Sequence, residues 1–139
     1  MQSWIKSVGH HYICRIEISG DFTGQATVDT YVKFIGDNKV GENCEFGHAA
    51  KIIEVDAGNN LKVGARTVIN CTDLGNDVTI GNNCIINAKS IGNNVTIGNN
   101  CEIEHDVNIP DGMSVPDMNY VMNDPDFNEV IFFKVKPAK

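Results

Sequence analysis

Three nearly identical segments decide the fold of this chain: Ile80-Gly81-Asn82-Asn83-Cys84, Ile91-Gly92-Asn93-Asn94-Val95 and Ile97-Gly98-Asn99-Asn100-Cys101. Each joins a large aliphatic residue to a Gly-Asn turn, and the aliphatic residues continue in both directions at steps of six, six and five. The full series is Phe22, Val28, Phe34, Val40, Phe46, Ile52, Ala57, Val63, Ile69, Leu74, Ile80, Ile86, Ile91, Ile97, Ile103, Ile109 and Val115. Three steps complete one circuit, as from Ala57 to Leu74 or from Ile91 to Ile109, which predicts a coil with three short sides.

A second small or branched residue stands two positions before many members of this series. These residues are Ala26, Val32, Ala50, Thr67, Val78, Cys84, Val95, Cys101 and Val107. Two alternate inward side chains per side are what a short β-strand provides. Coils of this kind stack roughly 4.8 Å apart and pair their backbones. The sequence therefore predicts an all-β, triangular, single-stranded parallel β-helix of about five coils of 17–18 residues.

The corners of this triangle are predicted at the glycines that follow the aliphatic residues. Gly and Asn tolerate tight turns, including left-handed backbone conformations. The glycines placed at corners are Gly36, Gly41, Gly47, Gly64, Gly75, Gly81, Gly92 and Gly98. Asn82 and Asn83 lie one coil below Asn99 and Asn100, and Asn59 and Asn60 precede Asn76 in the same way, so amide ladders are expected along the corners.

Both ends of a solenoid need covering, because bare strand edges invite end-to-end aggregation. We divide the chain into an N-terminal capping segment (1–21), the β-helix (22–116) and a C-terminal segment with a strand (117–139). Residues 10–19 alternate in polarity and predict a strand that caps the first coil. Residues 129–136 predict a second strand, which either folds back along a face or pairs with another subunit.

The composition restricts the possible partners. The chain has 139 residues, about one domain's worth. Eleven Lys and Arg against 18 Asp and Glu leave a net charge of -7, which disfavours nucleic acids and anionic membranes. No long apolar run or secretory signal is visible, and we expect a soluble, cytoplasmic protein.

The repeated Ile-Gly-x-x-Val/Cys units over residues 22–115 resemble those of the hexapeptide-repeat proteins. This resemblance implies a left-handed parallel β-helix and a homotrimer. Handedness rests on the resemblance alone, since spacing does not define it, and the five-residue steps leave room for a right-handed triangular solenoid of the bactofilin kind.

Cysteine and histidine are the side chains that could carry chemistry. Cys44, Cys84 and Cys101 fall on inward positions and are expected to serve as small core residues, whereas Cys71 is off phase and could be exposed. Cys14 belongs to the capping strand, and no Cys-x-x-Cys pair exists. Among the histidines, His10 and His11 precede that strand, and His48 and His105 are predicted at two different corners.

The segment Glu104-His105-Asp106-Val107 resembles the histidine-acidic pair of hexapeptide acyltransferases that modify sugars. By this resemblance His105 would act as general base on a small-molecule amine or hydroxyl acceptor, Asp106 would support the imidazole, and acetyl-CoA or another acyl-CoA would be the cosubstrate rather than a tightly bound cofactor. His48 is the other candidate base. The Asp-Val-Trp-Ile-Gly motif common in these enzymes is absent.

Two alternatives stay open. One is a non-catalytic assembly module, a short rod reinforced by amide ladders. The other is a zinc protein similar to γ-class carbonic anhydrases, which place three histidines around one metal. His48 lies about three coils, or roughly 14 Å, from the level of His105, so these two cannot share a zinc ion. We therefore predict no metal site.

Overall fold

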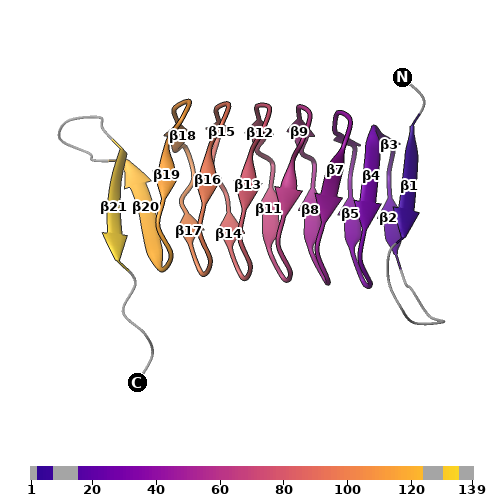
Figure 1. The fold of residues 1–139 in the computed structure, drawn as a ribbon, viewed down its shortest axis with the longest axis horizontal. Helices are drawn as coiled ribbons and strands as arrows, with labels where there is room; N and C mark the ends of the chain where they lie inside the picture. Colours follow the sequence, from indigo (N-terminus) through magenta and orange to yellow (C-terminus); the bar gives the residue numbers. More distant parts are fainter. Residues whose placement is uncertain (1–2, 8–15, 124–129, 135–139) are drawn as a thin grey trace.

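The chain coils around a long axis as a three-sided solenoid (Figure 1). The computed structural model describes residues 3–7, 16–123 and 130–134, the last range as backbone only. Over these ranges it contains 21 strands and no helix. Consecutive strands of the coils belong to different sheets, and each strand inside a sheet pairs with the strands one coil before and after it.

The strands form three sheets, one along each side of the solenoid. Sheet A consists of β1 (Trp4–Ser7), β4 (Gln25–Val28), β7 (Cys44–Phe46), β10 (Lys62–Val63), β13 (Thr79–Ile80), β16 (Thr96–Ile97) and β19 (Ser114–Val115). Sheet B consists of β2 (Glu17–Ser19), β5 (Lys33–Ile35), β8 (Lys51–Ile53), β11 (Val68–Asn70), β14 (Ile85–Ile86), β17 (Glu102–Ile103), β20 (Asn119–Asn123) and β21 (Val130–Lys134). Sheet C consists of β3 (Phe22–Thr23), β6 (Asn38–Lys39), β9 (Asp56–Ala57), β12 (Asp73–Leu74), β15 (Ser90–Ile91) and β18 (Asn108–Ile109).

The strand register confirms the predicted repeat. Ile69 is paired with Ile86, and Ile91 is paired with Ile109, which are the partners that the spacing of the aliphatic series requires. The first coil is an exception, because Phe22 is paired with Asn38 and not with Val40, its predicted partner. All strand pairs within the coils are parallel. The triangular parallel β-helix is therefore correct, while its left-handed sense stays a prediction from the resemblance.

The core is a column of aliphatic side chains inside the triangle. From Val28 onward, every residue of the predicted series is buried, and Phe22 packs against the core while half-exposed. Phe22, Phe34 and Phe46 meet edge to face, with ring centroids 4.9 and 5.2 Å apart. The second inward positions, Thr67 among them, are buried as well. Alternation along each short side therefore determines which residues face inward.

The solenoid is longer than predicted, and strands extend it at both ends. Sheet C has six strands, so the solenoid has six coils rather than about five. β1 and β2 pair in parallel with β4 and β5, and β20 pairs in parallel with β17. Of the expected N-terminal strand, residues 10–15, with His10, His11 and Cys14, lie outside the described residues. The predicted C-terminal strand is β21, which pairs antiparallel with β20 of the same chain.

The corner glycines serve a different purpose from the one predicted. Of the eight, only Gly36 has a left-handed φ, at +75°. In the coils that turn through Gly-Asn segments, the residue two positions after the glycine is left-handed, as at Asn83 (φ 57°). A Cβ on Gly81 would lie 2.5 Å from Asn99 Oδ1 and 2.8 Å from the Gly98 carbonyl carbon. Glycine is required there because the next coil passes too close for a side chain.

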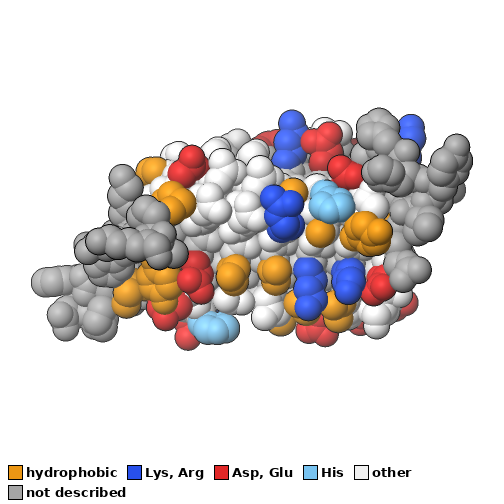
Figure 2. All heavy atoms as spheres, turned by 90° about the horizontal axis from the view of Figure 1, so that it is seen from below, with side chains coloured by type: hydrophobic (Ala, Val, Ile, Leu, Met, Phe, Trp, Pro, Cys, Tyr) orange, Lys and Arg blue, Asp and Glu red, His pale blue; other side chains and the backbone are white. Residues whose placement is uncertain are grey.

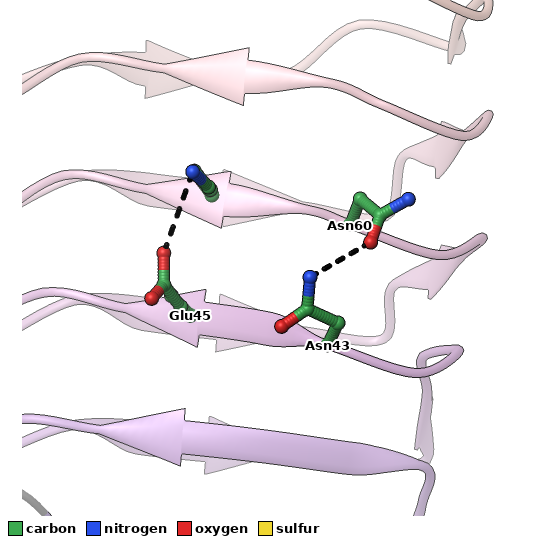
Figure 3. Close-up of polar contacts among 4 residues, drawn as sticks. Asn43, Glu45 and Asn60 are labelled. Carbon is green, nitrogen blue, oxygen red and sulfur yellow. Dashed lines mark hydrogen bonds and ion pairs between the residues drawn. The ribbon is translucent and has the colours of Figure 1, made fainter.

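Amide ladders follow two of the corners, as expected. Asn76 Oδ1 accepts a hydrogen bond from the Asn59 N–H, and Asn93 Oδ1 from the Asn76 N–H, each at 2.8 Å. In a second ladder the side chains bond to one another directly. Asn43 Nδ2 donates to Asn60 Oδ1 at 2.9 Å (Figure 3). These bonds satisfy polar groups that corner geometry leaves out of the sheets.

Candidate functional site

One corner departs from the regular repeat, the corner where the chain passes from sheet B to sheet C. We call it the BC corner. Its step is five residues in three successive coils, from Ile52 to Ala57, from Ile69 to Leu74 and from Ile86 to Ile91. In the coil of β17 and β18 the step from Ile103 to Ile109 is six. The additional residue lengthens the turn and brings His105 and Asp106 out to the surface, where both are exposed.

A hollow of about 310 Å³ lies at this corner, which we call the BC hollow. It spans three coils, and its lining residues are Asn70, Cys71, Asn87, Ala88, Lys89, His105 and Asp106. Ala88, one of these lining residues, is itself fully buried. Beneath it, the Thr72 hydroxyl donates to the Ala88 carbonyl at 2.8 Å, which ties two of the coils together.

The imidazole of His105 has no hydrogen-bond or ion-pair partner among the described residues. Asp106 is its neighbour in the chain, yet no hydrogen bond joins the two side chains. Asp106 instead occupies the left-handed corner position, with φ 63°, and its carbonyl accepts a bond from Asn123 Nδ2 at 2.9 Å. The structure therefore places His105 and Asp106 side by side and leaves the imidazole open to a ligand.

Cys71 is the thiol of this hollow. It is exposed, as its off-phase position predicted, and its Sγ lies 3.2 Å from Asn70 Oδ1, to which it donates. The other cysteines of the described residues, Cys44, Cys84 and Cys101, are buried in the core as expected. Burial raises the pKa of the Cys44 and Cys84 thiols, which keeps them protonated and unreactive.

His48 does not join this site. It is exposed in the turn between β7 and β8, whereas His105 follows β17, three strands further along sheet B and at its opposite edge. That separation is roughly 14 Å along the axis alone. The His48 ring packs edge to face on Tyr31, with centroids 5.7 Å apart. Within one chain, the two candidate bases cannot act at one centre.

A second hollow, of about 350 Å³, lies over sheet A. Glu45 and Lys62 line it and form an ion pair at 3.9 Å, which Figure 3 shows beside the amide ladder. Its other lining residues are mainly Thr27, core aliphatics and corner glycines and asparagines. It contains no imidazole or thiol, so the smaller hollow is the better candidate for chemistry.

No cluster of three or more His, Cys, Asp or Glu side chains in the described part of the chain could hold a metal ion. In the same ranges, no helix has the length and apolarity needed to cross a membrane.

Three parallel sheets, a register of one coil between paired strands and Ile-Gly-Asn-Asn corners are now established together. The chain folds as a three-sided parallel β-solenoid. No protein-family model and no curated protein matches the sequence of this solenoid.

Solved structures similar to the solenoid include two described as acetyltransferases. A "putative acetyltransferase" of Bacillus cereus is 16% identical with a TM-score of 0.37, and the match covers 96% of this chain and 85% of that one. The polySia-specific acetyltransferase NeuO is 17% identical with a TM-score of 0.30, and the match covers 99% of this chain and 89% of that one. Likenesses this distant assign no activity to the solenoid.

Sequence reasoning missed three residues of the BC hollow: Asn70, Asn87 and Lys89. A signal for them was present in the step lengths. Three five-residue steps followed by one of six mean that the last turn projects beyond its neighbours. The polar residues of the preceding corners then face the residues of the longer turn.

Proposed function

We propose that this protein transfers an acyl group from acyl-CoA to a small amine or hydroxyl acceptor, with His105 as general base in the BC hollow. The observation that carries the proposal is an exposed imidazole, unpartnered among the described residues, in one hollow with a cation and two amides. An imidazole is suited to this work because it titrates near neutral pH.

The reaction needs one group that moves a proton twice. His105 takes the proton from the acceptor's N–H or O–H as that atom attacks the thioester carbonyl. When the tetrahedral intermediate collapses, the C–S bond breaks and the proton passes to the leaving CoA thiolate. The products are the acylated acceptor and free CoA, and His105 returns to its neutral form.

The other polar residues of the hollow match two parts of an acyl-CoA, its phosphates and its pantetheine arm. Lys89 is exposed, and its ammonium group offers a positive charge to the CoA phosphates. The amides of Asn70 and Asn87 can each donate to and accept from the amide groups of the pantetheine arm. Asp106 supports the imidazolium by its nearby negative charge rather than by a hydrogen bond.

Calorimetry with acetyl-CoA tests binding, and release of free thiol with a panel of amines and sugars tests transfer. The wild type is expected to bind and to transfer. His105→Ala should keep binding and lose transfer, whereas Lys89→Ala should weaken binding. His48→Ala is the matched control, because it removes an exposed imidazole at a different corner, and we expect both measurements to be unchanged.

Absence of binding heat with the wild-type protein would refute the transferase proposal and favour the assembly module. Equal loss of transfer in His48→Ala and His105→Ala would refute His105 as the base.

A further inference from the structure

The outward faces of the three sheets differ in character. The outward column of sheet A carries Lys6, Thr27, Glu45, Lys62, Thr79, Thr96 and Ser114, and its one large exposed hydrophobic residue among the described strands is Trp4, in the first strand. The outward column of sheet C carries Lys39, Asp56, Asp73, Ser90 and Asn108. In sheet B the outward residues include Ile35, Ile53, Val68 and Ile85. Among the described strands, sheet B therefore presents the apolar face.

Charge is distributed unevenly along this face. One outward column of sheet B runs, coil by coil, through Glu17, Lys33, Lys51, Val68, Ile85, Glu102 and Tyr120. Lys33 and Lys51 stand on one side of the apolar pair, with Glu17 beyond them, and Glu102 stands on the other side. Figure 2 views the solenoid from one side, with its axis across the picture, and hydrophobic side chains lie there between basic and acidic ones.

The apolar centre is exposed, and the charged residues nearest to it on either side are unpaired among the described residues. Ile85 is 46% exposed, a large value for isoleucine. Lys33 forms an ion pair with Glu17 at 3.7 Å. Lys51 and Glu102 have no ion-pair partner among the described residues.

The acidic end carries additional negative charge. Glu104 follows β17, and the Tyr120 hydroxyl donates a hydrogen bond to its carboxylate. This bond, together with the charges of Glu104 and Glu102, raises the pKa of Tyr120 to about 12. The tyrosine stays protonated, so it shares the negative charge of Glu104 without adding to it.

From this order we infer that two copies of the chain pair face to face through sheet B, with their solenoid axes antiparallel and a two-fold axis passing between Val68 and Ile85. Val68 of each copy then faces Ile85 of the other. Lys51 of each copy faces Glu102 of the other, and the two ion pairs flank the apolar centre.

The same face disfavours arrangements with parallel axes. Parallel solenoids bring residues of the same coil together, which sets Glu102 and Glu104 of one copy against those of the next. Like charges opposed at an interface cost several kcal/mol. The order of charges along sheet B therefore favours the antiparallel pair over a parallel pairing through the same face.

The area of the sheet B face limits how tightly the two copies are expected to bind each other. The seven parallel strands of sheet B, spaced about 4.8 Å apart and each about three residues long, cover roughly 30 by 10 Å. Even with the corner side chains added, the interface falls at the low end of specific contacts, below about 1,200 Å² in total. The dimer should therefore dissociate reversibly as the protein is diluted.

Sedimentation velocity over a range of concentrations tests the pairing. We expect a monomer–dimer equilibrium for the wild type, and a Kd at least about tenfold weaker for Lys51→Glu or Glu102→Lys alone. Mixing these two variants should restore dimers, because each altered residue then faces its new opposite charge. Lys39→Glu makes the same charge change on sheet C and should leave the Kd unchanged.

Cross-linking supplies an independent measurement. On a Cys71→Ser background, Val68→Cys and Ile85→Cys chains should form an intermolecular disulfide when they are mixed, faster than either forms one alone. A trimer, a monomer at all concentrations, no recovery on mixing the charge variants, or equal cross-linking in the separate and mixed samples would each overturn the inference.

Discussion

Asn99 Oδ1 accepts a hydrogen bond from the backbone N–H of Asn82, one coil nearer the N-terminus, at 2.8 Å. The same bond joins Ala65 to Asn82 and Asn99 to Asp117, each at 2.7 Å. Each corner amide thus satisfies the preceding corner, and the chain is reinforced along its axis as well as around its coils.

Asn99→Ala should lower the free energy of unfolding by about 1 kcal/mol, because the Asn82 N–H loses its acceptor. Asn99→Asp keeps an acceptor in place, as Asp117 does in the next coil. We expect it to stay within about 0.5 kcal/mol of the wild type. Urea denaturation followed by circular dichroism measures both, and equal losses would show that the hydrogen bond does not matter.

Gly81 and Gly112 should respond differently to Ala and Asn. Gly81 has no room for a Cβ, so both substitutions should cost about 1–3 kcal/mol. Gly112 has open space but a left-handed φ of +75°. There Ala should cost about 1–2 kcal/mol and Asn less, because Asn tolerates that conformation. Thermal melts of the four variants decide the matter, and a benefit of Asn over Ala at Gly81 would contradict the close-approach explanation.

Phe34→Ala should destabilise the protein by about 3–5 kcal/mol, because the ring is fully buried between two other aromatic rings. Phe22→Ala is the comparison, and the half-exposed ring should cost less. Chemical denaturation gives both values. Similar losses would mean that the first coil is packed as tightly as the second.

Thiol labelling of the folded protein should modify Cys71 and spare Cys44, Cys84 and Cys101. Cys71 is exposed and the other three are buried, with Cys84 Sγ donating to the Gly98 carbonyl at 3.0 Å. Iodoacetamide treatment followed by peptide mass mapping reads out each site. Labelling of Cys84 as fast as Cys71 would contradict the buried placement.

Stability should fall as the pH rises above about 9. Cys44 and Cys84 have folded-state pKa values raised above 9.0 by burial, so above that pH the unfolded chain ionises first and unfolding is favoured. Below pH 9 both states keep the protons and this contribution is constant. Denaturation between about pH 8 and 10 should show a shallower fall for a Cys44→Ala, Cys84→Ala double variant, and an unchanged slope would refute the assignment.

The repeat could be predicted from sequence because inward positions of a solenoid admit few residue types. Where a polar residue occupies such a position the pattern fails. Asn119 stands one coil beyond Cys101 and is buried, yet its Nδ2 donates to the carbonyls of Pro116 and Asp117. The apolar series continues to the buried Val121, six residues after Val115, but with a polar residue at the alternate inward position the last coil shows only half of the pattern.

The first strand and the BC hollow could be predicted only in part, because some of their residues neither continue nor interrupt the repeat. β1 contributes a single inward residue, Ile5, which is too little to show a period. His105 and Cys71 stood out because they break the repeat. Asn87 and Lys89 did not, because their role depends on how far the following turn projects.

The parallel pairing of each strand with the strand one coil further on also bears on how the chain folds. Every sheet contact closes a loop of about one coil, and the entropy cost of such closure changes only slowly with length. Coils can therefore be added one after another to any pair that has already formed, as in other repeat proteins. A parallel β-sheet, usually slow to assemble because its partners are distant in the chain, here assembles from near neighbours.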